Sequence, residues 1–300
     1  MVKGIVTSIQ RFSLTDGDGI RTTVFFKGCN MNCGWCHNPE TIKSGRELMF
    51  YESKCIGCGK CFAACPAQAQ TTVNGRHRID RSKCIGCGKC AEVCYAEALV
   101  MCGTEMSVED IMKEVRQDKA YYKNSKGGVT LSGGEVLCQK EFAMAIADAC
   151  HEEGISVAVE TNLCFAYDYA KDLLGKVDLI MCDLKIFDDE AHKAHTGVSN
   201  AVIVKNIKKI DELGIPVIVR TPLIPGATDS KDNIEKIATY IKDMKNLFRY
   251  ELLNFNPLGE GKYKGLDKEN KFEYARPFGE DKLGEIRRLL DEIGVAYKIV

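Results

Sequence analysis

The sequence predicts an α/β fold with a parallel sheet, interrupted by a small cysteine-rich insert. Downstream of Cys102, short apolar runs alternate with longer segments of helical spacing, and this βα alternation is typical of parallel sheets. Between residues 50 and 102 the alternation stops, and cysteine and glycine become dense. We therefore expect a core made of residues 1–49 and 103–300, and an inserted domain at 50–102.

Six short apolar runs are the predicted strands of the core. Near-continuous apolar runs, such as the one from Ile215 to Val219, suit strands that are buried on both faces. Periodicity leaves open whether the sheet is doubly wound or curled into a full or partial barrel. The six predicted strands are Thr23–Phe26, Gly128–Leu131, Ile155–Glu160, Val177–Asp183, Ile215–Thr221 and Tyr250–Phe255.

Helix signals lie between these strands. Ser107 to Asp110 has the form of a capping box, in which the first hydroxyl and the last carboxylate satisfy each other's backbone donors. The segment Leu137–Glu153 has helical apolar spacing. Thr228 to Ser230 supplies a cap for a helix that we expect to run to about Lys245.

Cysteine is the residue type that departs from an ordinary composition, with 16 in 300 residues. The segment Met1–Ser8 has no signal-peptide features, and no stretch reaches the ~18 apolar residues of a membrane span. We therefore expect a cytoplasmic chain, where disulfides are rare and dense cysteines indicate metal. With 41 basic and 42 acidic residues, the net charge of −1 gives no reason to expect nucleic acid or a membrane as a partner.

The insert contains a duplicated unit. The nonapeptide Ser53–Cys61 recurs as Ser82–Cys90, and each copy extends to a C-x2-C-x2-C-x3-C spacing. This spacing is typical of two-cluster iron–sulfur proteins, in which the fourth cysteine of each run binds the other cluster, and the segment resembles a bacterial two-cluster ferredoxin. A zinc module is the alternative, but zinc uses two pairs of cysteines rather than runs of three. The predicted [4Fe–4S] ligand sets are Cys55, Cys58, Cys61 and Cys94 for one cluster, and Cys84, Cys87, Cys90 and Cys65 for the other.

A third cysteine group follows the first predicted strand. Cys29, Cys33 and Cys36 have a C-x3-C-x2-C spacing, with Trp35 before the last cysteine. Three thiolates can hold a [4Fe–4S] cluster while one iron stays open to a substrate. Residues Cys33 to His37 also spell the C-x-x-C-H signal for haem attachment, an alternative that needs an export route and leaves Cys29 unexplained.

With its flanking residues, this group resembles the radical S-adenosylmethionine (SAM) enzymes and, within them, the glycyl radical enzyme activating enzymes. The segment Asp16–Phe25 resembles the DGPGIRTTVF of that family, with Asp18 in place of proline. The resemblance implies a partial (β/α)6 barrel, and a ferredoxin-like insert marks one branch of the family. It also implies reductive cleavage of SAM to a 5′-deoxyadenosyl radical, which abstracts hydrogen from a backbone glycine of a partner glycyl radical enzyme. The implied cofactors are three [4Fe–4S] clusters and SAM, with flavodoxin or ferredoxin as reductant and a monomer when alone.

The resemblance also assigns roles to residues outside the cysteine groups. Glu135 in the GGE motif would bind the SAM amino group, Lys185 in a DLK motif would lie near the SAM carboxylate, and Asp16 would contact the glycyl peptide. Asn256 stands where the family has a histidine that contacts SAM. The full implied SAM-binding set is Trp35, Ser132, Gly133, Gly134, Glu135, Asp183, Lys185, Arg220 and Asn256, and an implied monovalent-cation site comprises Glu160, Thr161, Met181 and Asp183.

The remaining cysteines and histidines lack ligand spacing. We expect structural roles for them, because free cysteine often packs as a small apolar side chain. This group comprises Cys102, Cys138, Cys150, Cys164, Cys182, His151, His192 and His195. Two other functions stay open: a radical SAM enzyme with auxiliary clusters of the peptide or sulfatase maturase type, and a non-catalytic electron-transfer subunit. The sequence does not encode the partner's identity.

Overall fold

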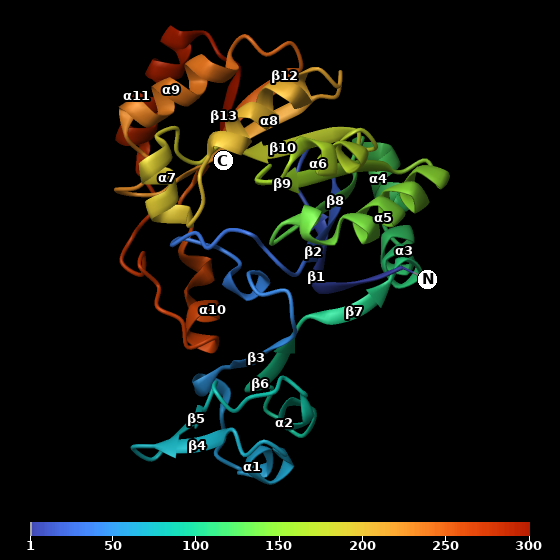
Figure 1. Cartoon of the computed structure of the whole chain (residues 1–300), viewed down its shortest axis with the longest axis vertical. Coiled ribbons are helices and arrows are strands. Elements are labelled where there is room, and N and C mark those ends of the chain that lie inside the picture. Colours follow the sequence, from blue (N-terminus) through green and yellow to red (C-terminus); the bar gives the residue numbers. More distant parts are fainter. Residues whose placement is uncertain (1) are drawn as a thin grey trace.

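The computed structural model describes residues 2–300 as a large α/β body and a smaller body below it (Figure 1). The large body is built on a nine-stranded sheet with the order β13-β12-β11-β10-β9-β8-β2-β1-β7. Seven of these strands are parallel, so the predicted α/β class with a mainly parallel sheet is confirmed. The parallel strands are β2 (Arg21–Phe26), β8 (Gly128–Gly133), β9 (Ser156–Thr161), β10 (Leu179–Asp183), β11 (Val217–Leu223), β12 (Leu247–Asn254) and β13 (Tyr297–Ile299).

The first strand in the chain was not predicted. β1 (Lys3–Ser13) pairs antiparallel with β2 on one side and with β7 (Thr104–Ser107) on the other. The strands that were predicted are observed with their ends moved by up to three residues. Boundaries shift in this way because the last ladder bonds, rather than the apolar pattern, define where a strand ends.

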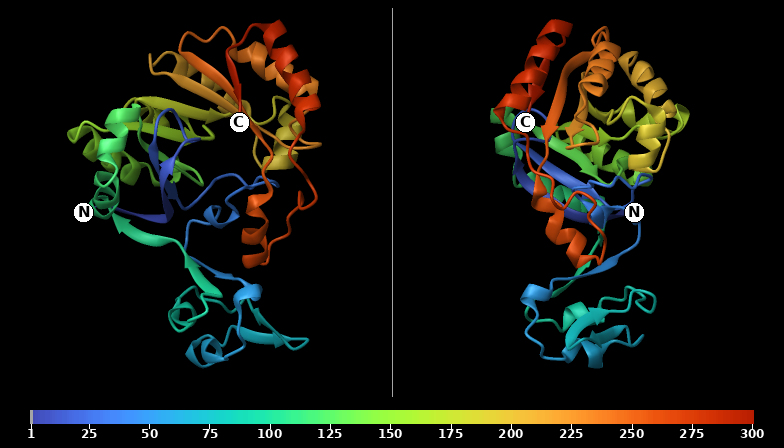
Figure 2. Two further views of the ribbon diagram at one scale, coloured as in Figure 1. Left: turned by 180° about the vertical axis from the view of Figure 1, so that it is seen from behind. Right: turned by 90° about the vertical axis from the view of Figure 1, so that its left-hand side faces the viewer.

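Helices connect the parallel strands and cover the outer face of the sheet (Figures 1 and 2). The capping box at Ser107 is confirmed, since its side chain accepts from the Asp110 N–H and the Asp110 carboxylate accepts in return. Two helix boundaries were predicted wrongly. The segment from Val136 to Gln139 is a 3-10 turn before a helix that begins at Lys140, and the helix capped by Ser230 ends at Ile241. The helices are α3 (Val108–Arg116), α4 (Lys119–Ser125), α5 (Lys140–Glu152), α6 (Tyr167–Leu174), α7 (Asp189–Thr196), α8 (Ala201–Asp211), α9 (Lys231–Ile241), α10 (Glu260–Gly265) and α11 (Glu280–Ile293).

The two faces of the sheet differ in chemistry. Side chains alternate along each strand, so Leu131 and Val219 pack into the main core under the helices. Their neighbours Thr130 and Arg220 are also buried, but on the inner face, where polar side chains share the space with a small apolar cluster. The inner face therefore has a buried polar interior.

The smaller body is held on a two-stranded stalk (Figure 2). β3 (Glu47–Phe50) and β6 (Leu99–Cys102) pair antiparallel and carry the segment between them away from the central sheet. That segment contains α1 (Lys60–Ala64), the hairpin β4 (Gln70–Val73) and β5 (Arg76–Ile79), and α2 (Lys89–Glu92). Its core is small and separate, formed by Leu48, Phe50, Ile79, Ala98 and Leu99 with several cysteines.

Among residues 2–300, no helix has the length and apolar character that crossing a membrane requires.

Candidate active site

The loop that carries Cys29, Cys33 and Cys36 begins where β2 ends. Its backbone is fixed from one side by the end of α7, because the Asn32 N–H donates to the Thr196 carbonyl at 2.9 Å and the Gly34 N–H donates to the His195 carbonyl at 3.0 Å. The last carbonyls of a helix have no partner within the helix, so they are available to a neighbouring loop. The cysteine loop therefore depends on the position of α7.

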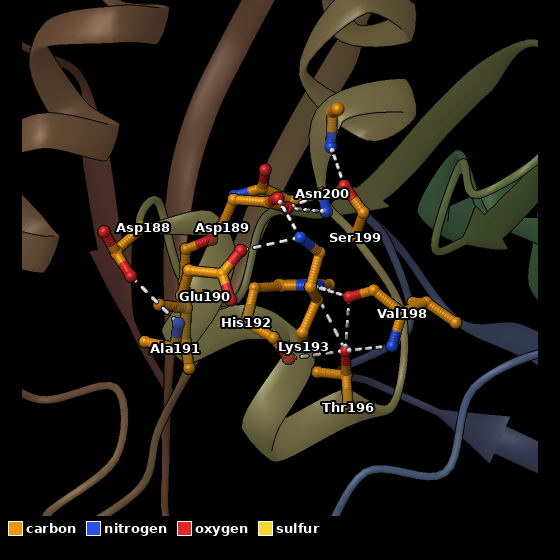
Figure 3. A network of polar contacts seen from close by, with 12 residues as sticks. Asp188, Asp189, Glu190, Ala191, His192, Lys193, Thr196, Val198, Ser199 and Asn200 are labelled. Carbon is orange, nitrogen blue, oxygen red and sulfur yellow. Dashed lines mark hydrogen bonds and ion pairs between the residues drawn. The ribbon is translucent and has the colours of Figure 1, made fainter.

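A polar network fixes α7 and the turn that follows it (Figure 3). Asp188 caps the helix by accepting from the Ala191 N–H at 2.9 Å, and Asp189 accepts from the Asn200 N–H at 2.8 Å. His192 is fully buried, with Nδ1 at 2.8 Å from the Val198 carbonyl. The Val198 carbonyl is thus the partner of His192, which the sequence did not reveal. The contact holds the end of α7 in place.

The three cysteines of this loop are half-buried. Burial raises the pKa of all three, that of Cys36 to about 12. Without iron they are therefore neutral, and binding of a metal cluster must release their protons. The nearby charge of Lys185 opposes this rise at Cys33 and Cys36 and so favours the thiolate.

Lys185 follows the end of β10 and pairs with Asp183 at 2.6 Å. Burial alone would lower the pKa of Lys185, but the carboxylate of Asp183 outweighs it and raises that pKa, and Cys33 and Cys29 add to the rise when they are thiolates. Lys185 is therefore a permanent positive charge beside the cysteine loop. It lies at the carboxyl ends of the parallel strands, the edge at which such sheets bind ligands.

Gly133 and Gly134 allow the turn after β8 to lie directly on the cysteine loop. Gly133 has φ +119°, and a Cβ there would lie 2.2 Å from the Phe26 nitrogen. A Cβ on Gly134 would lie 2.3 Å from the Gly28 oxygen. Only glycine fits at both positions, so close packing against β2 and its loop already explains the pair.

Glu135 turns inward from this motif and is fully buried. Its Oε1 accepts from the Leu137 N–H at 3.0 Å and the Thr161 hydroxyl at 2.8 Å, and its Oε2 accepts from the Asn162 N–H at 2.7 Å. A carboxylate has about four acceptor positions, so one stays open on Oε2. Burial raises the pKa of Glu135 to about 7, against the opposing effect of these donors.

Arg220 lies on the inner face of β11 and is only 2 % exposed. Its Nη1 pairs with Glu160 at 2.6 Å, and its Nε pairs with Glu251 at 2.8 Å. Its Nη2 donates to the Thr15 carbonyl at 2.9 Å. This buried network gives the arginine a structural role that the apolar strand pattern did not reveal.

The network extends beyond the residues singled out in the sequence. Arg249 pairs with Glu251 at 2.6 Å and with Asp18 at 2.9 Å. Sequence analysis missed both Glu251 and Arg249. The signal available in the sequence was a charged residue inside each of two apolar strands. In the structure Arg220 and Glu251 are directly paired in the β11–β12 register.

The residues of the expected cation site are engaged with other side chains. Glu160 pairs with Arg220 and also accepts from the Ser132 hydroxyl. Thr161 donates to Glu135, and Asp183 pairs with Lys185. Met181 is fully buried in the small apolar cluster of the inner face.

Three further predicted site residues lie in local contacts. Asp16 accepts from Ser13 at the end of β1 and from Thr23 in the first half of β2, each at 2.7 Å, whereas Cys29 lies three residues beyond the other end of β2. Trp35 is 9 % exposed and lies in a cluster with Ile186, Ile224 and Phe272. Asn256 is exposed, and its Oδ1 caps the short turn η4 (Pro257–Gly259) by accepting from the Leu258 N–H at 3.0 Å.

The smaller body brings seven of its eight spaced cysteines into two groups, four in one and three in the other. Cys55, Cys58, Cys61 and Cys94 line one cavity of about 250 Å³. In the other group, burial and then the neighbouring thiols of Cys65 and Cys84 raise the pKa of Cys90 to about 11. Across residues 2–300, no three His, Cys, Asp or Glu side chains converge on a single metal ion.

The five cysteines without ligand spacing have mixed environments. Cys102, Cys150 and Cys182 are buried, Cys164 is half-buried and Cys138 is exposed.

Profiles of known families match three parts of the chain. Residues 85–240 match the radical SAM superfamily, residues 48–95 match a 4Fe-4S dicluster domain and residues 15–71 match a 4Fe-4S single cluster domain. A solved radical SAM methyltransferase from Sphaerobacter thermophilus shares the fold, with a TM-score of 0.56 at 13 % identity over 98 % of this chain and 76 % of that one.

Curated relatives are more similar in sequence. The benzylsuccinate synthase activating enzyme of Thauera aromatica is 43 % identical, covering 90 % of this chain and 84 % of its own. The trans-4-hydroxy-L-proline dehydratase activating enzyme of Clostridioides difficile is 39 % identical over 98 % of both chains. The chain therefore belongs to the radical SAM superfamily and, within it, to the glycyl radical enzyme activating enzymes.

Proposed function

We propose that this chain activates a partner glycyl radical enzyme by radical SAM chemistry, and that Cys29, Cys33 and Cys36 hold the catalytic [4Fe–4S] cluster. The observation that carries the proposal is the meeting of these thiols with Lys185 and the glycine turn at the carboxyl ends of parallel strands. When bound, the cluster supplies one electron that cleaves SAM to methionine and a 5′-deoxyadenosyl radical, which abstracts hydrogen from a glycine of the partner. A three-thiol set fits this chemistry because one iron stays without a protein ligand.

The residues around the loop suit the two charged ends of SAM. Lys185 is half-buried, positively charged and close to Cys33, so it is suited to the SAM carboxylate. Glu135 has one open acceptor position on Oε2, which an ammonium group can fill. Ser132, Gly133, Gly134, Asp183 and Trp35 complete the proposed site, and Arg220 acts through Glu160 by holding the inner face of the sheet.

The order β2-β8-β9-β10-β11-β12 supports a partial (β/α)6 barrel as the core, made of residues 1–49 and 103–300. Residues 50–102 form the proposed ferredoxin-like domain with two further [4Fe–4S] clusters. The cavity lined by four cysteines supports the first ligand set, and the proximity of Cys65 to Cys84 and Cys90 supports the second. These clusters would pass electrons from flavodoxin or ferredoxin, in a monomer kept in a reducing cytoplasm.

The roles of Asp16 and Asn256, and the cation site at Glu160, Thr161, Met181 and Asp183, stay predictions. Glu160 already has a cationic partner in Arg220. A monovalent cation would have to share its carboxylate with that guanidinium.

The test is activation in the absence of oxygen. The reconstituted protein is incubated with SAM, dithionite and the glycyl radical enzyme encoded by a neighbouring gene. We expect 5′-deoxyadenosine by chromatography and a glycyl radical by electron paramagnetic resonance. Cys33→Ser should abolish both products, whereas the matched control Cys138→Ser should retain both. SAM cleavage without a glycyl radical would favour a different radical SAM reaction, and absence of cleavage would contradict the proposal.

A further inference from the structure

The cavity in the insert contains one imidazole that the proposed function does not use. The ring of His77 packs against Phe50 at 4.5 Å and Phe62 at 5.1 Å between ring centroids. Its Nδ1 lies 3.9 Å from the Cys55 sulfur, and its Nε2 lies 3.9 Å from the Cys61 sulfur. One side chain therefore contacts two of the four thiols that line the cavity.

The hairpin β4–β5 also sets which nitrogen of His77 carries a proton. Gln70 and His77 lie on the same face of the hairpin, because Thr72 pairs with His77 and Gln70 precedes Thr72 by two residues. The Gln70 Oε1 lies 2.6 Å from the His77 Nε2. A carbonyl oxygen only accepts, so Nε2 carries the proton and Nδ1 presents a lone pair to Cys55.

This arrangement suits a neutral Cys55 thiol, whose S–H can donate to Nδ1. The arrangement leaves the amide nitrogen of Gln70 unpaired. Gln70 is 7 % exposed, and its Nε2 has no hydrogen-bond partner. That nitrogen is one of three buried side-chain polar atoms without a hydrogen bond in residues 2–300. An unpaired buried N–H group is more costly than an under-used carbonyl oxygen.

Turning the Gln70 amide over reverses the direction of these bonds. The amide nitrogen then donates to Nε2 of His77, and the ring carries its proton on Nδ1, aimed at Cys55. A Cys55 thiolate bound to iron has no proton to donate and would repel a lone pair on Nδ1. Cluster assembly therefore favours the turned arrangement.

We propose that Gln70 and His77 form a relay that donates an N–H···S hydrogen bond to the Cys55 thiolate and raises the reduction potential of the cluster in this cavity. Hydrogen bonds to ligand sulfurs stabilise the more negative, reduced state of an iron–sulfur cluster. The inference rests on the proposed function, because it requires clusters in the insert.

The second ligand set supplies an internal comparison. In the described chain, residues 2–300, no side chain hydrogen-bonds to a sulfur of Cys84, Cys87, Cys90 or Cys65, and the backbone N–H of Ala69 donates to Cys65 at 3.2 Å. The nonapeptide is duplicated, but the histidine contact is not. The relay would therefore separate the potentials of two clusters with the same ligand spacing.

The test is a redox titration followed by electron paramagnetic resonance. It uses the full chain with Cys29, Cys33 and Cys36 changed to alanine, so that only the insert clusters contribute. In His77→Phe, which keeps the aromatic packing, we expect the ratio of reduced to oxidised cluster to fall about tenfold at fixed potential. That change equals about 59 mV for a one-electron couple and should affect one couple only. His77→Gln should restore part of it, since an amide can still donate.

Thr72→Val is the matched control, since Thr72 lines the same cavity and its side chain makes no hydrogen bond to a sulfur within residues 2–300. It should leave both couples at their original potentials. The relay is wrong if His77→Phe leaves both couples unchanged, moves both equally, or removes one cluster. Iron and sulfide analysis distinguishes failure of the relay from failure of the proposed function. Absence of clusters from the insert of the parent chain would contradict the proposed function itself.

Discussion

Replacing Glu135 by glutamine removes a buried charge while keeping the shape of the side chain. Burial raises the pKa of Glu135 from its ordinary 4.5 to about 7 in the folded chain. Folding therefore takes up a proton between these two pH values, and the carboxylate makes the folded state less stable as pH rises through about 7. The total loss in the free energy of unfolding is about 3 kcal/mol, since each tenfold change in the acid dissociation constant of Glu135 corresponds to about 1.4 kcal/mol.

The Glu135→Gln variant should lack this dependence. Its amide turns one accepting oxygen into a donor that faces a backbone or hydroxyl donor, at a cost of about 1–3 kcal/mol that does not change with pH. The informative quantity is therefore the slope of the difference in stability between the two proteins. Below pH 5 the original chain should be the more stable by the largest margin, and the margin should shrink by about 3 kcal/mol up to pH 8.

The assay is urea unfolding of the cluster-free chain under reducing conditions, across this pH range. SAM binding to the reconstituted protein gives an independent readout, because an ammonium group favours the carboxylate. SAM affinity of the original chain should rise as pH passes about 7, and that of the variant should not. A stability difference that stays constant from pH 5 to pH 8 would refute the argument from burial.

Three other substitutions test separate parts of the site. Lys185→Met should weaken SAM binding tenfold or more at unchanged iron content, since a charge-assisted hydrogen bond contributes about 1.5–3 kcal/mol, and calorimetric titration measures this. Arg220→Met leaves the half-buried Glu160 without its cationic partner and the buried Glu251 with Arg249 alone, so the free energy of unfolding should fall by about 3 kcal/mol, and an unchanged urea midpoint would contradict the network. Gly133→Ala places a Cβ against the backbone of β2 at φ +119°, so iron bound per chain should fall even before SAM is added.

The strands of the parallel sheet were predictable because each is an apolar run long enough to be recognised on its own. β13 was not, since its three residues Tyr297–Ile299 become a strand only by pairing with β12. β1 is half-exposed along much of its length, and its place between β2 and β7 depends on partners far along the chain. Strand pairing of this kind is a tertiary property, which a local pattern does not contain.

The same distinction applies to the site. Cysteine spacing is local, so the sequence alone could predict which thiols belong together. The role of Arg220 could not be predicted in this way, because its partners Glu251 and Glu160 lie 31 and 60 residues away. The SAM contact matched to Arg220 stays a prediction, and three of its five N–H groups are directed to protein oxygens.

The glycine turn and the cysteine loop form one rigid unit rather than two separate binding elements. The Gly134 N–H donates to the Phe26 carbonyl at 2.9 Å, and the Glu135 N–H donates to the Gly28 carbonyl at 2.8 Å. On the opposite side, the end of α7 accepts from the loop through its last two carbonyls. A ligand that contacts both the proposed cluster and the glycine turn would therefore bind between two elements whose relative position is already fixed. This lowers the entropic cost of orienting the ligand. For the same reason, a substitution in the turn should disturb the cluster loop as much as it disturbs SAM.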